Sequence, residues 1–277
     1  MHKIIFSLVI LGLTLTSCER YETIDFDIPF KSKVVVASFL TTDINNPQIA
    51  VWLTRTTKAV GSETPQTPTY VTDAEVTLIH EGNSYLLVYD SMEKVYVGDM
   101  NGVPFESGKK YTLLVKSGDE TVTGHTTIPL PAITESTCEI DSSYSMSGLT
   151  YLVTFNTKQL SAGNNHLFLY PYIVFEDSSR YALFYDGRDR ARASRQGQTI
   201  SQTFSASYSQ SRPVRVELLT YTCDEPYASY YNKSATFNYG SLGMAFGEVT
   251  ITYSNMSNKI GVFASYVASN GESFPLQ

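Results

Sequence analysis

The stretch Ala74-Glu75-Val76-Thr77-Leu78 alternates apolar and polar residues one by one. Successive side chains of a β-strand point to opposite faces of the sheet, so this pattern predicts a strand with one buried face. The β-branched run at residues 33–40 and the apolar run at 49–54 are too short for a typical helix. They predict two buried strands beside the first one.

Turn signals separate four further strands in the first half of the chain. Glu81-Gly82-Asn83-Ser84 is one turn, and Ser117-Gly118-Asp119 predicts a hairpin. Gly61, Pro65 and Pro68 make residues 57–72 a loop. The further strands are expected at residues 85–89, 95–97, 111–115 and 120–128. About seven short strands without a helical stretch are typical of a β-sandwich of immunoglobulin-like size.

Pro129-Leu130-Pro131 predicts a boundary, because proline lacks the N–H that a strand ladder needs. We therefore expect a β-sandwich domain at 33–131 and a second β-rich domain at 132–277. The clearest strands expected in the second domain lie at residues 149–155, 166–175, 180–185, 214–221, 247–253 and 260–267. The predicted fold class is all-β, an immunoglobulin-like β-sandwich followed by a second β-rich domain with a short helix.

The short helix is expected to begin at Asp224-Glu225-Pro226. Aspartate is a good helix N-cap, and an acidic residue and a proline suit the first turn. Tyr227, Tyr230, Tyr231 and Ala235 follow at helical spacing.

Leu15-Thr16-Ser17-Cys18 follows one cation, Lys3, and an apolar run at residues 4–15. This is the form of a secretory signal. The run is about a dozen residues long, whereas a membrane-spanning helix needs ~20. The stretch resembles the lipobox of bacterial lipoproteins, which implies cleavage before Cys18 and acylation of its thiol. Residues 1–17 would then be a lipoprotein signal peptide and 18–32 a tether; the alternative is an ordinary signal with an incidental cysteine.

Glu19 and Glu22 make the start of the tether acidic, although Arg20 interrupts them. An acidic stretch after the lipidated cysteine resembles the surface-export signal of Bacteroidota lipoproteins. A solvated tether is the alternative reading. Acyl chains contribute ~0.8 kcal/mol for each buried CH₂, so two or three of them anchor a protein stably.

Composition excludes several classes of function. The net charge of −7 argues against binding to nucleic acid and to anionic membrane surfaces. The 20 tyrosines and 14 phenylalanines, beside a single tryptophan, favour β-structure. Two cysteines follow Cys18, namely Cys138 and Cys223. They either pair as a disulfide or stay as free thiols, and without a paired-Cys spacing they predict no zinc site.

The three histidines after the signal are His80, His125 and His166, far apart in the chain. None belongs to a recognisable ligand pair, and neither a Gly-x-Ser-x-Gly elbow nor a phosphate loop occurs. We therefore expect no cofactor, no metal and no enzymatic activity. An enzyme would need a pocket in which polar groups converge on one of these histidines.

Two surface features are candidates for recognition. The stretch Tyr185 to Arg195 carries four arginines in an acidic chain: Arg188, Arg190, Arg192 and Arg195. It predicts a loop that meets an acidic partner or a carboxylate, the alternative being a solvated connection offset by Asp186 and Asp189. Tyrosines cluster at Tyr170-Pro171-Tyr172, Tyr181, Tyr185 and residues 227–231. They suit either a recognition surface or half-buried sheet packing, and the single tryptophan argues against carbohydrate stacking.

Three stretches carry a resemblance to a known family. They are residues 71–78 with 107–113, the segment around Tyr227 and Tyr230-Tyr231, and residues 249–256 leading into 260–266. Together with the lipobox they resemble the Bacteroidota lipoproteins grouped as domain of unknown function 4249 (DUF4249). Ser257-Asn258-Lys259 stands where that family usually has glycines.

The resemblance implies an outer-membrane lipoprotein, often encoded beside a TonB-dependent receptor, and supplies no catalytic residues. We therefore expect a surface-exposed, lipid-anchored accessory or binding component of a TonB-dependent uptake system. The partners would be the outer membrane and a barrel receptor, with no nucleic acid; the resemblance names no ligand. The alternative is a structural or adhesive cell-surface protein without a transport role.

Overall fold

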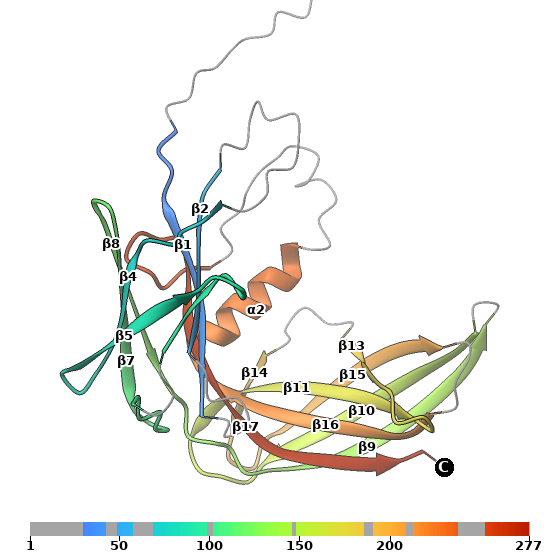
Figure 1. Cartoon of the computed structure of the whole chain (residues 1–277). Coiled ribbons are helices and arrows are strands. Elements are labelled where there is room, and N and C mark those ends of the chain that lie inside the picture. Colours follow the sequence, from blue (N-terminus) through green and yellow to red (C-terminus); the bar gives the residue numbers. More distant parts are fainter. Residues whose placement is uncertain are drawn as a thin grey trace, which may run out of the picture. The chain divides into compact units, whose positions relative to one another are not determined.

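The computed structural model describes residues 30–42, 49–57, 69–98, 102–145, 148–185, 191–208, 213–237 and 253–276. Within these ranges the fold is all-β, as predicted, apart from one short helix (Figure 1). No helix in the described ranges has both the length and the hydropathy to span a membrane.

All seven strands predicted in the first half are present. The strands of this half are β1 (Val34–Thr41), β2 (Ala50–Arg55), β3 (Thr69–Tyr70), β4 (Glu75–His80), β5 (Asn83–Asp90), β6 (Val95–Val97), β7 (Lys110–Ser117) and β8 (Glu120–Thr127). The hairpin predicted at Gly118 joins β7 to β8, whose residues pair from Ser117↔Glu120 to Lys110↔Thr127.

The second half contains more strands than the sequence suggests. They are β9 (Thr134–Ser145), β10 (Gly148–Gln159), β11 (Asn164–Phe175), β12 (Arg180–Ala182), β13 (Phe184–Tyr185), β14 (Ala191–Arg195), β15 (Thr199–Tyr208), β16 (Pro213–Cys223) and β17 (Gly261–Pro275). The strand expected at 180–185 is divided into β12 and β13, while β9, β14 and β15 were not among the predicted strands. The strand expected at 247–253 lies outside the described residues except for Tyr253, which is not in a strand.

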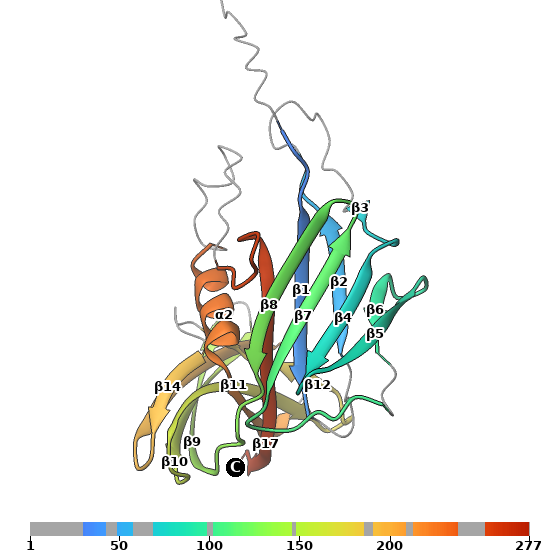
Figure 2. The same cartoon turned by 90° about the vertical axis from the view of Figure 1, so that its left-hand side faces the viewer.

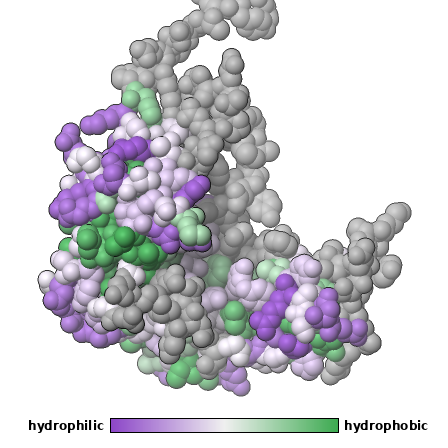
Figure 3. All heavy atoms as spheres, viewed as in Figure 1, coloured by the Kyte–Doolittle hydropathy of each residue, from purple (hydrophilic) through white to green (hydrophobic). Residues whose placement is uncertain are grey.

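A β-sandwich forms around the strands of the first half. Its sheet path runs β17-β1-β2-β6-β5-β4-β7-β8, and Figure 2 shows β7 and β8 lying over β1 and β2. One aliphatic core joins the two layers, with Val36 and Leu53 from one side and Leu78 and Leu113 from the other, all at most 1% exposed. On β5 the outward Leu86 and Val88 are exposed, and Figure 3 shows hydrophobic residues gathered over this strand.

The last strand, β17, belongs to both halves of the chain. It pairs in parallel with β1, from Val36↔Gly261 to Thr41↔Tyr266, and then antiparallel with β16. Its Phe263 and Val267 are buried in the sandwich core. The sandwich is therefore not confined to the predicted segment 33–131, because β1 needs a partner on its second edge; Ser32–Gln277 forms one compact unit.

A glycine makes the parallel pairing of β1 with β17 feasible. Gly261 has a φ of 105°, and a Cβ there would overlap the carbonyl oxygen of Val36. A residue with a side chain would be strained in this backbone conformation and would also hold the two strands apart.

The remaining strands make a second packed region. The sheet β13-β15-β10-β9 packs against β11 and β16. Val153, Phe155 and Phe204 on one side meet Ile173 and Leu218 on the other.

Helix α2 (Glu225–Phe237) begins where the sequence predicts it. The Asp224 side chain caps it by accepting a hydrogen bond from the backbone N–H of Tyr227 at 2.9 Å.

Candidate functional site

The two faces of β1 and β2 differ in chemistry. Residues 34, 36 and 40 of β1 point into the sandwich core, so Ala37, Phe39 and Thr41 lie on its outer face. Trp52 of β2 pairs with Ala37 and lies on the same outer face, where its side chain is 42% exposed. The only tryptophan of the chain is therefore a surface residue on a rigid strand.

A cavity of about 770 Å³ lies over this outer face, and we call it the aromatic cleft. Its lining comes from three parts of the chain. They are the sheet (Phe39, Thr41, Ala50, Trp52, Val95, Val97, Gly98 and Tyr266), helix α2 (Tyr227 and Tyr231), and the end of β5 with the turn that follows it (Asp90 and Glu93). Its volume falls in the range of ~300–1,000 Å³ that is typical of small-molecule sites.

Ring contacts fix the helical wall of the aromatic cleft. The Tyr227 ring lies 4.6 Å from that of Tyr231, 5.7 Å from Phe39 and 5.3 Å from Tyr266, between centroids. Burial, and secondarily the neighbouring Tyr231, raises the pKa of Tyr227 far above its ordinary value. The phenol therefore stays protonated, and this wall is neutral.

From Tyr266 on β17 the rings continue beyond the cleft as a band across two more strands, β16 and β11. Tyr266 contacts Tyr221 at 5.4 Å, Tyr221 contacts Tyr170 at 6.5 Å, and Tyr170 contacts Tyr172 at 4.9 Å. Burial, with a smaller contribution from Tyr170, raises the pKa of Tyr172 to about 12. The tyrosine clusters at 170–172 and 227–231 are thus mainly half-buried packing on one face of the sheet, although Tyr170 remains 37% exposed.

Asp224 holds the start of the helical wall against the sheet. Its carboxyl contacts the hydroxyl of Thr126 on β8, and its backbone N–H donates to the carbonyl of Ser265 on β17 at 3.1 Å. Burial raises the pKa of Asp224, although the hydrogen bonds to its carboxyl from Thr126, Tyr227 and Ser265 act in the opposite direction. Further along the helix, the Asn232 amide makes two hydrogen bonds of 2.8 and 2.9 Å to the backbone of Ala191. Hydrogen bonds at Asp224 and at Asn232 therefore hold the helical wall of the cleft in place on either side of Tyr227 and Tyr231.

Two carboxylates form the acidic rim of the aromatic cleft. Oδ1 of Asp90 accepts hydrogen bonds from the backbone N–H groups of Met92 at 2.8 Å and Glu93 at 3.2 Å, which fixes the turn. Among the described residues, none donates a hydrogen bond to Oδ2 of Asp90, so this oxygen can accept one from a ligand. The described residues that line the cleft include no Lys, Arg or His. The cleft therefore combines aromatic rings with hydrogen-bond acceptors and negative charge.

Comparison with known proteins places the chain in a family. A family model described as "Domain of unknown function (DUF4249)" matches residues 21–271. The chain belongs to the DUF4249 family. No curated protein matches it. Among solved structures, the crystal structure of bovine butyrophilin matches with 9% identity and a TM-score of 0.22, over 69% of this chain and 92% of that chain. A TM-score this low supports no functional argument.

The arginine stretch of the DUF4249 chain is not one loop. Arg188 and Arg190 lie outside the described residues, but Arg192 and Arg195 lie on strand β14, which pairs antiparallel with β11. The loop prediction is wrong for this part because the backbone of the segment pairs with β11 along its whole length and one of the residues between the arginines is buried. This residue, Ser194, is 1% exposed.

Arg195 lies beside a second cavity of about 600 Å³, lined by Asn164, Asn165, His166, Ala193, Ser194, Arg195 and Gln198. His166 also contributes to an ion pair, its Nε2 lying 2.9 Å from Oε2 of Glu225 on helix α2. In the described part of the chain, no hydroxyl or thiol lies within hydrogen-bond reach of this imidazole. The cavity thus joins two of the predicted candidates, Arg195 and His166, without the contacts of an activated nucleophile.

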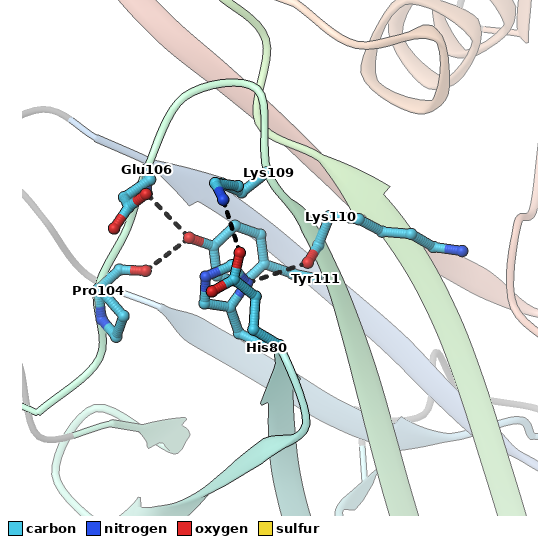
Figure 4. Close-up of polar contacts among 7 residues, drawn as sticks. His80, Pro104, Glu106, Lys109, Lys110 and Tyr111 are labelled. Carbon is cyan, nitrogen blue, oxygen red and sulfur yellow. Dashed lines mark hydrogen bonds and ion pairs between the residues drawn. The ribbon is translucent and has the colours of Figure 1, made fainter.

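The other two histidines have structural surroundings. His80 is 3% exposed and stacks on Tyr111 at 4.3 Å, and its Nδ1 lies 3.2 Å from the carbonyl oxygen of Lys110. The Tyr111 hydroxyl in turn donates to Pro104 and accepts from the Glu106 N–H (Figure 4). His125 contacts the Thr112 hydroxyl at 2.9 Å across the β7–β8 hairpin.

Both described cysteines are free thiols, in agreement with the second alternative for this pair. Cys138 is on β9, and Cys223 is at the end of β16. Burial raises the pKa of Cys138 to about 11 and that of Cys223 well above its ordinary value, so neither is a reactive thiolate. Cys18 lies outside the described residues.

Sequence reasoning missed the residues that form the aromatic cleft. Trp52, Asp90 and Tyr227 come from three separated segments, and no local motif links them. One signal was present: Trp52 occupies the outward phase of an alternating strand, where a polar residue is the usual choice.

Proposed function

We propose that this DUF4249 chain is a lipid-anchored binding protein of the outer-membrane surface, the component of a TonB-dependent uptake system that captures a ligand. The single observation that carries the proposal is the aromatic cleft. Ring contacts fix its helical wall against Phe39, its volume suits a small ligand, and its floor is a β-sheet. The lipobox-like stretch ending at Cys18 supports the anchoring, and the family resemblance supports the uptake system.

The contrasting hypothesis is a structural or adhesive surface protein. It shares the anchor and the sandwich but needs neither a barrel partner nor a ligand cleft. The two hypotheses therefore differ in what accompanies the protein when the membrane is dissolved.

A pull-down from the native membrane tests the proposal. The full chain, carrying a C-terminal tag, is extracted in mild detergent, and mass spectrometry identifies what is recovered with it. We expect a TonB-dependent barrel in stoichiometric amount. Recovery of the chain alone, still in the membrane fraction, would reject the uptake role and favour the adhesive one.

The Cys18→Ala variant is the matched control for the anchor. We expect it to leave the membrane fraction and to lose incorporation of radiolabelled palmitate. A variant that stays in the membrane and still incorporates label would contradict lipidation at Cys18.

A further inference from the structure

We infer that the aromatic cleft binds a neutral saccharide, which stacks on Trp52 and donates hydroxyl hydrogen bonds to Asp90 and Glu93. This inference rests on the proposed function, since it names the ligand class of the same cleft.

The floor of the cleft suits a sugar ring. Trp52 is 42% exposed on a strand that pairs on both sides, with β1 and with β6, so its indole is presented on a rigid, flat surface. The C–H groups on one side of a pyranose ring carry slight positive charge and lie favourably on the negative face of an aromatic ring. Ala50, Val97 and Gly98 beside Trp52 are small, which leaves room for a ring against the indole.

The rim supplies what sugar hydroxyls need. A carboxylate accepts hydrogen bonds and donates none, so it pairs with hydroxyl donors, and such charge-assisted bonds are strong. Asp90 is held in place by two backbone N–H groups on its Oδ1, which orients Oδ2 in advance of binding. Glu93 lies in the turn that follows Asp90. Its side chain is exposed and can reach a second hydroxyl of the sugar.

Charge excludes one ligand class and disfavours another. An anionic ligand would meet Asp90 and Glu93 and, among the described lining residues, no cation. A cationic ligand would use several ring faces that surround it. The Phe39, Tyr227 and Tyr231 rings instead pack against one another at 4.6 to 6.2 Å, so they form a wall rather than an open cage.

The single tryptophan makes a direct binding assay available. All indole emission of the chain comes from Trp52, so a change on titration reports the cleft and nothing else. The full chain in detergent is titrated with maltohexaose, cellohexaose, mannohexaose and laminarihexaose, which sample α- and β-linked neutral hexose polymers. We expect a saturable blue shift with at least one of them at millimolar concentration.

Variants test the residue roles. Asp90→Asn keeps the oxygen that accepts the turn's hydrogen bonds but removes the charge. Combined with Glu93→Gln, it should lower the affinity for the responsive saccharide by about tenfold. Trp52→Ala, followed by calorimetry, should abolish binding. Tyr181→Ala removes an exposed ring outside the cleft and should leave affinity unchanged.

Three results would overturn the inference. They are no emission change with any of the saccharides, a response to tetramethylammonium or trilysine instead of saccharides, and a saccharide response that survives Trp52→Ala in calorimetry. A failure here with a barrel still recovered in the pull-down would reject the ligand class and leave the uptake role standing. Saccharide binding by a chain that recovers no barrel in the pull-down would support the ligand class and reject the uptake role.

Discussion

The inner and outer faces of strands β1 and β2 share one backbone and have opposite chemistry. The inner face is aliphatic, with Val36, Val51 and Leu53 at most 1% exposed in the sandwich core. The outer face carries Phe39 and Trp52, and helix α2 covers only part of it. Aliphatic side chains fill a core by shape, whereas exposed aromatic rings also offer a flat face to a ligand. The inner face therefore stabilises the fold, and the outer face supplies the lining of the aromatic cleft.

The largest effect on stability is expected from truncating a side chain in the core that the inner face helps to form. Phe263 on β17 is fully buried in the core that β1 and β2 face. Phe263→Ala should lower the free energy of unfolding by about 3–5 kcal/mol, because it leaves a cavity as well as removing buried area. Denaturant unfolding followed by far-ultraviolet circular dichroism measures this. A loss below about 1 kcal/mol would mean that β17 is not part of the sandwich core.

The second prediction concerns the backbone that both faces share. Gly261→Ala places a methyl group against the Val36 carbonyl at a φ of 105°. We expect a loss of about 2 kcal/mol or more, since the strand must shift and the residue is strained. Gly82→Ala is a matched control, because its φ is also positive, at 82°, but a Cβ there meets nothing within 4 Å. Equal losses in the two variants would show that conformational strain alone matters and that the β1–β17 approach does not.

The third prediction concerns Asp224, which ties helix α2 of the outer face to the sandwich. Three contacts run in series: Asp224 with Thr126, Thr126 with Ser265 at 2.8 Å, and the Ser265 hydroxyl with the Thr127 carbonyl at 2.9 Å. Each of these three hydrogen bonds needs one donated proton, but the hydroxyls of Thr126 and Ser265 together supply only two protons. A protonated Asp224 supplies the third, which agrees with the direction in which burial raises its pKa.

The pH dependence follows from that raised pKa. The folded state holds the proton more tightly than the unfolded state, whose aspartate has a pKa of ~3.9. This contribution is complete below pH ~4 and is lost as the pH rises through the folded pKa, at about 1.4 kcal/mol for each unit of elevation.

Asp224→Asn provides the matching test, because its amide donates to Thr126 at every pH while its oxygen still caps the helix. We expect this variant to equal or exceed the wild type in stability at pH 7 and to lose its advantage as the pH falls to 4. Thermal melts across this range measure the difference. A variant less stable than wild type at pH 7 would indicate that the charged carboxylate is the stabilising form.

Local patterns were sufficient for much of the fold and for little of the site. Alternation predicted β4 from Ala74 to Leu78, and the Asp224 cap predicted the start of α2, because both signals act over a few residues. Strand β14 was not predicted, because its charged residues Arg192 and Arg195 are typical of a solvated loop. Its backbone nevertheless pairs with β11.

The parallel pairing of β1 with β17 joins residues more than 200 positions apart, and no period in the sequence encodes it. The aromatic cleft depends on that pairing, since it brings Tyr266 next to Thr41 and helix α2 over Phe39. The number of tryptophans likewise says nothing about the face on which Trp52 lies.

The smallest effect on stability, and the sharpest separation of the two faces, is expected from Trp52→Ala. Nearly half of this side chain is already in water, and its strand neighbours on the outer face are small, so truncation removes little buried area and leaves no closed cavity. We expect the free energy of unfolding to fall by less than about 1 kcal/mol in denaturant unfolding, whereas Phe263→Ala should lower it by about 3–5 kcal/mol. The same substitution should abolish saccharide binding in calorimetry. If Trp52→Ala instead destabilises the chain as strongly as Phe263→Ala does, the outer face is a second core and the division between a folding face and a binding face fails.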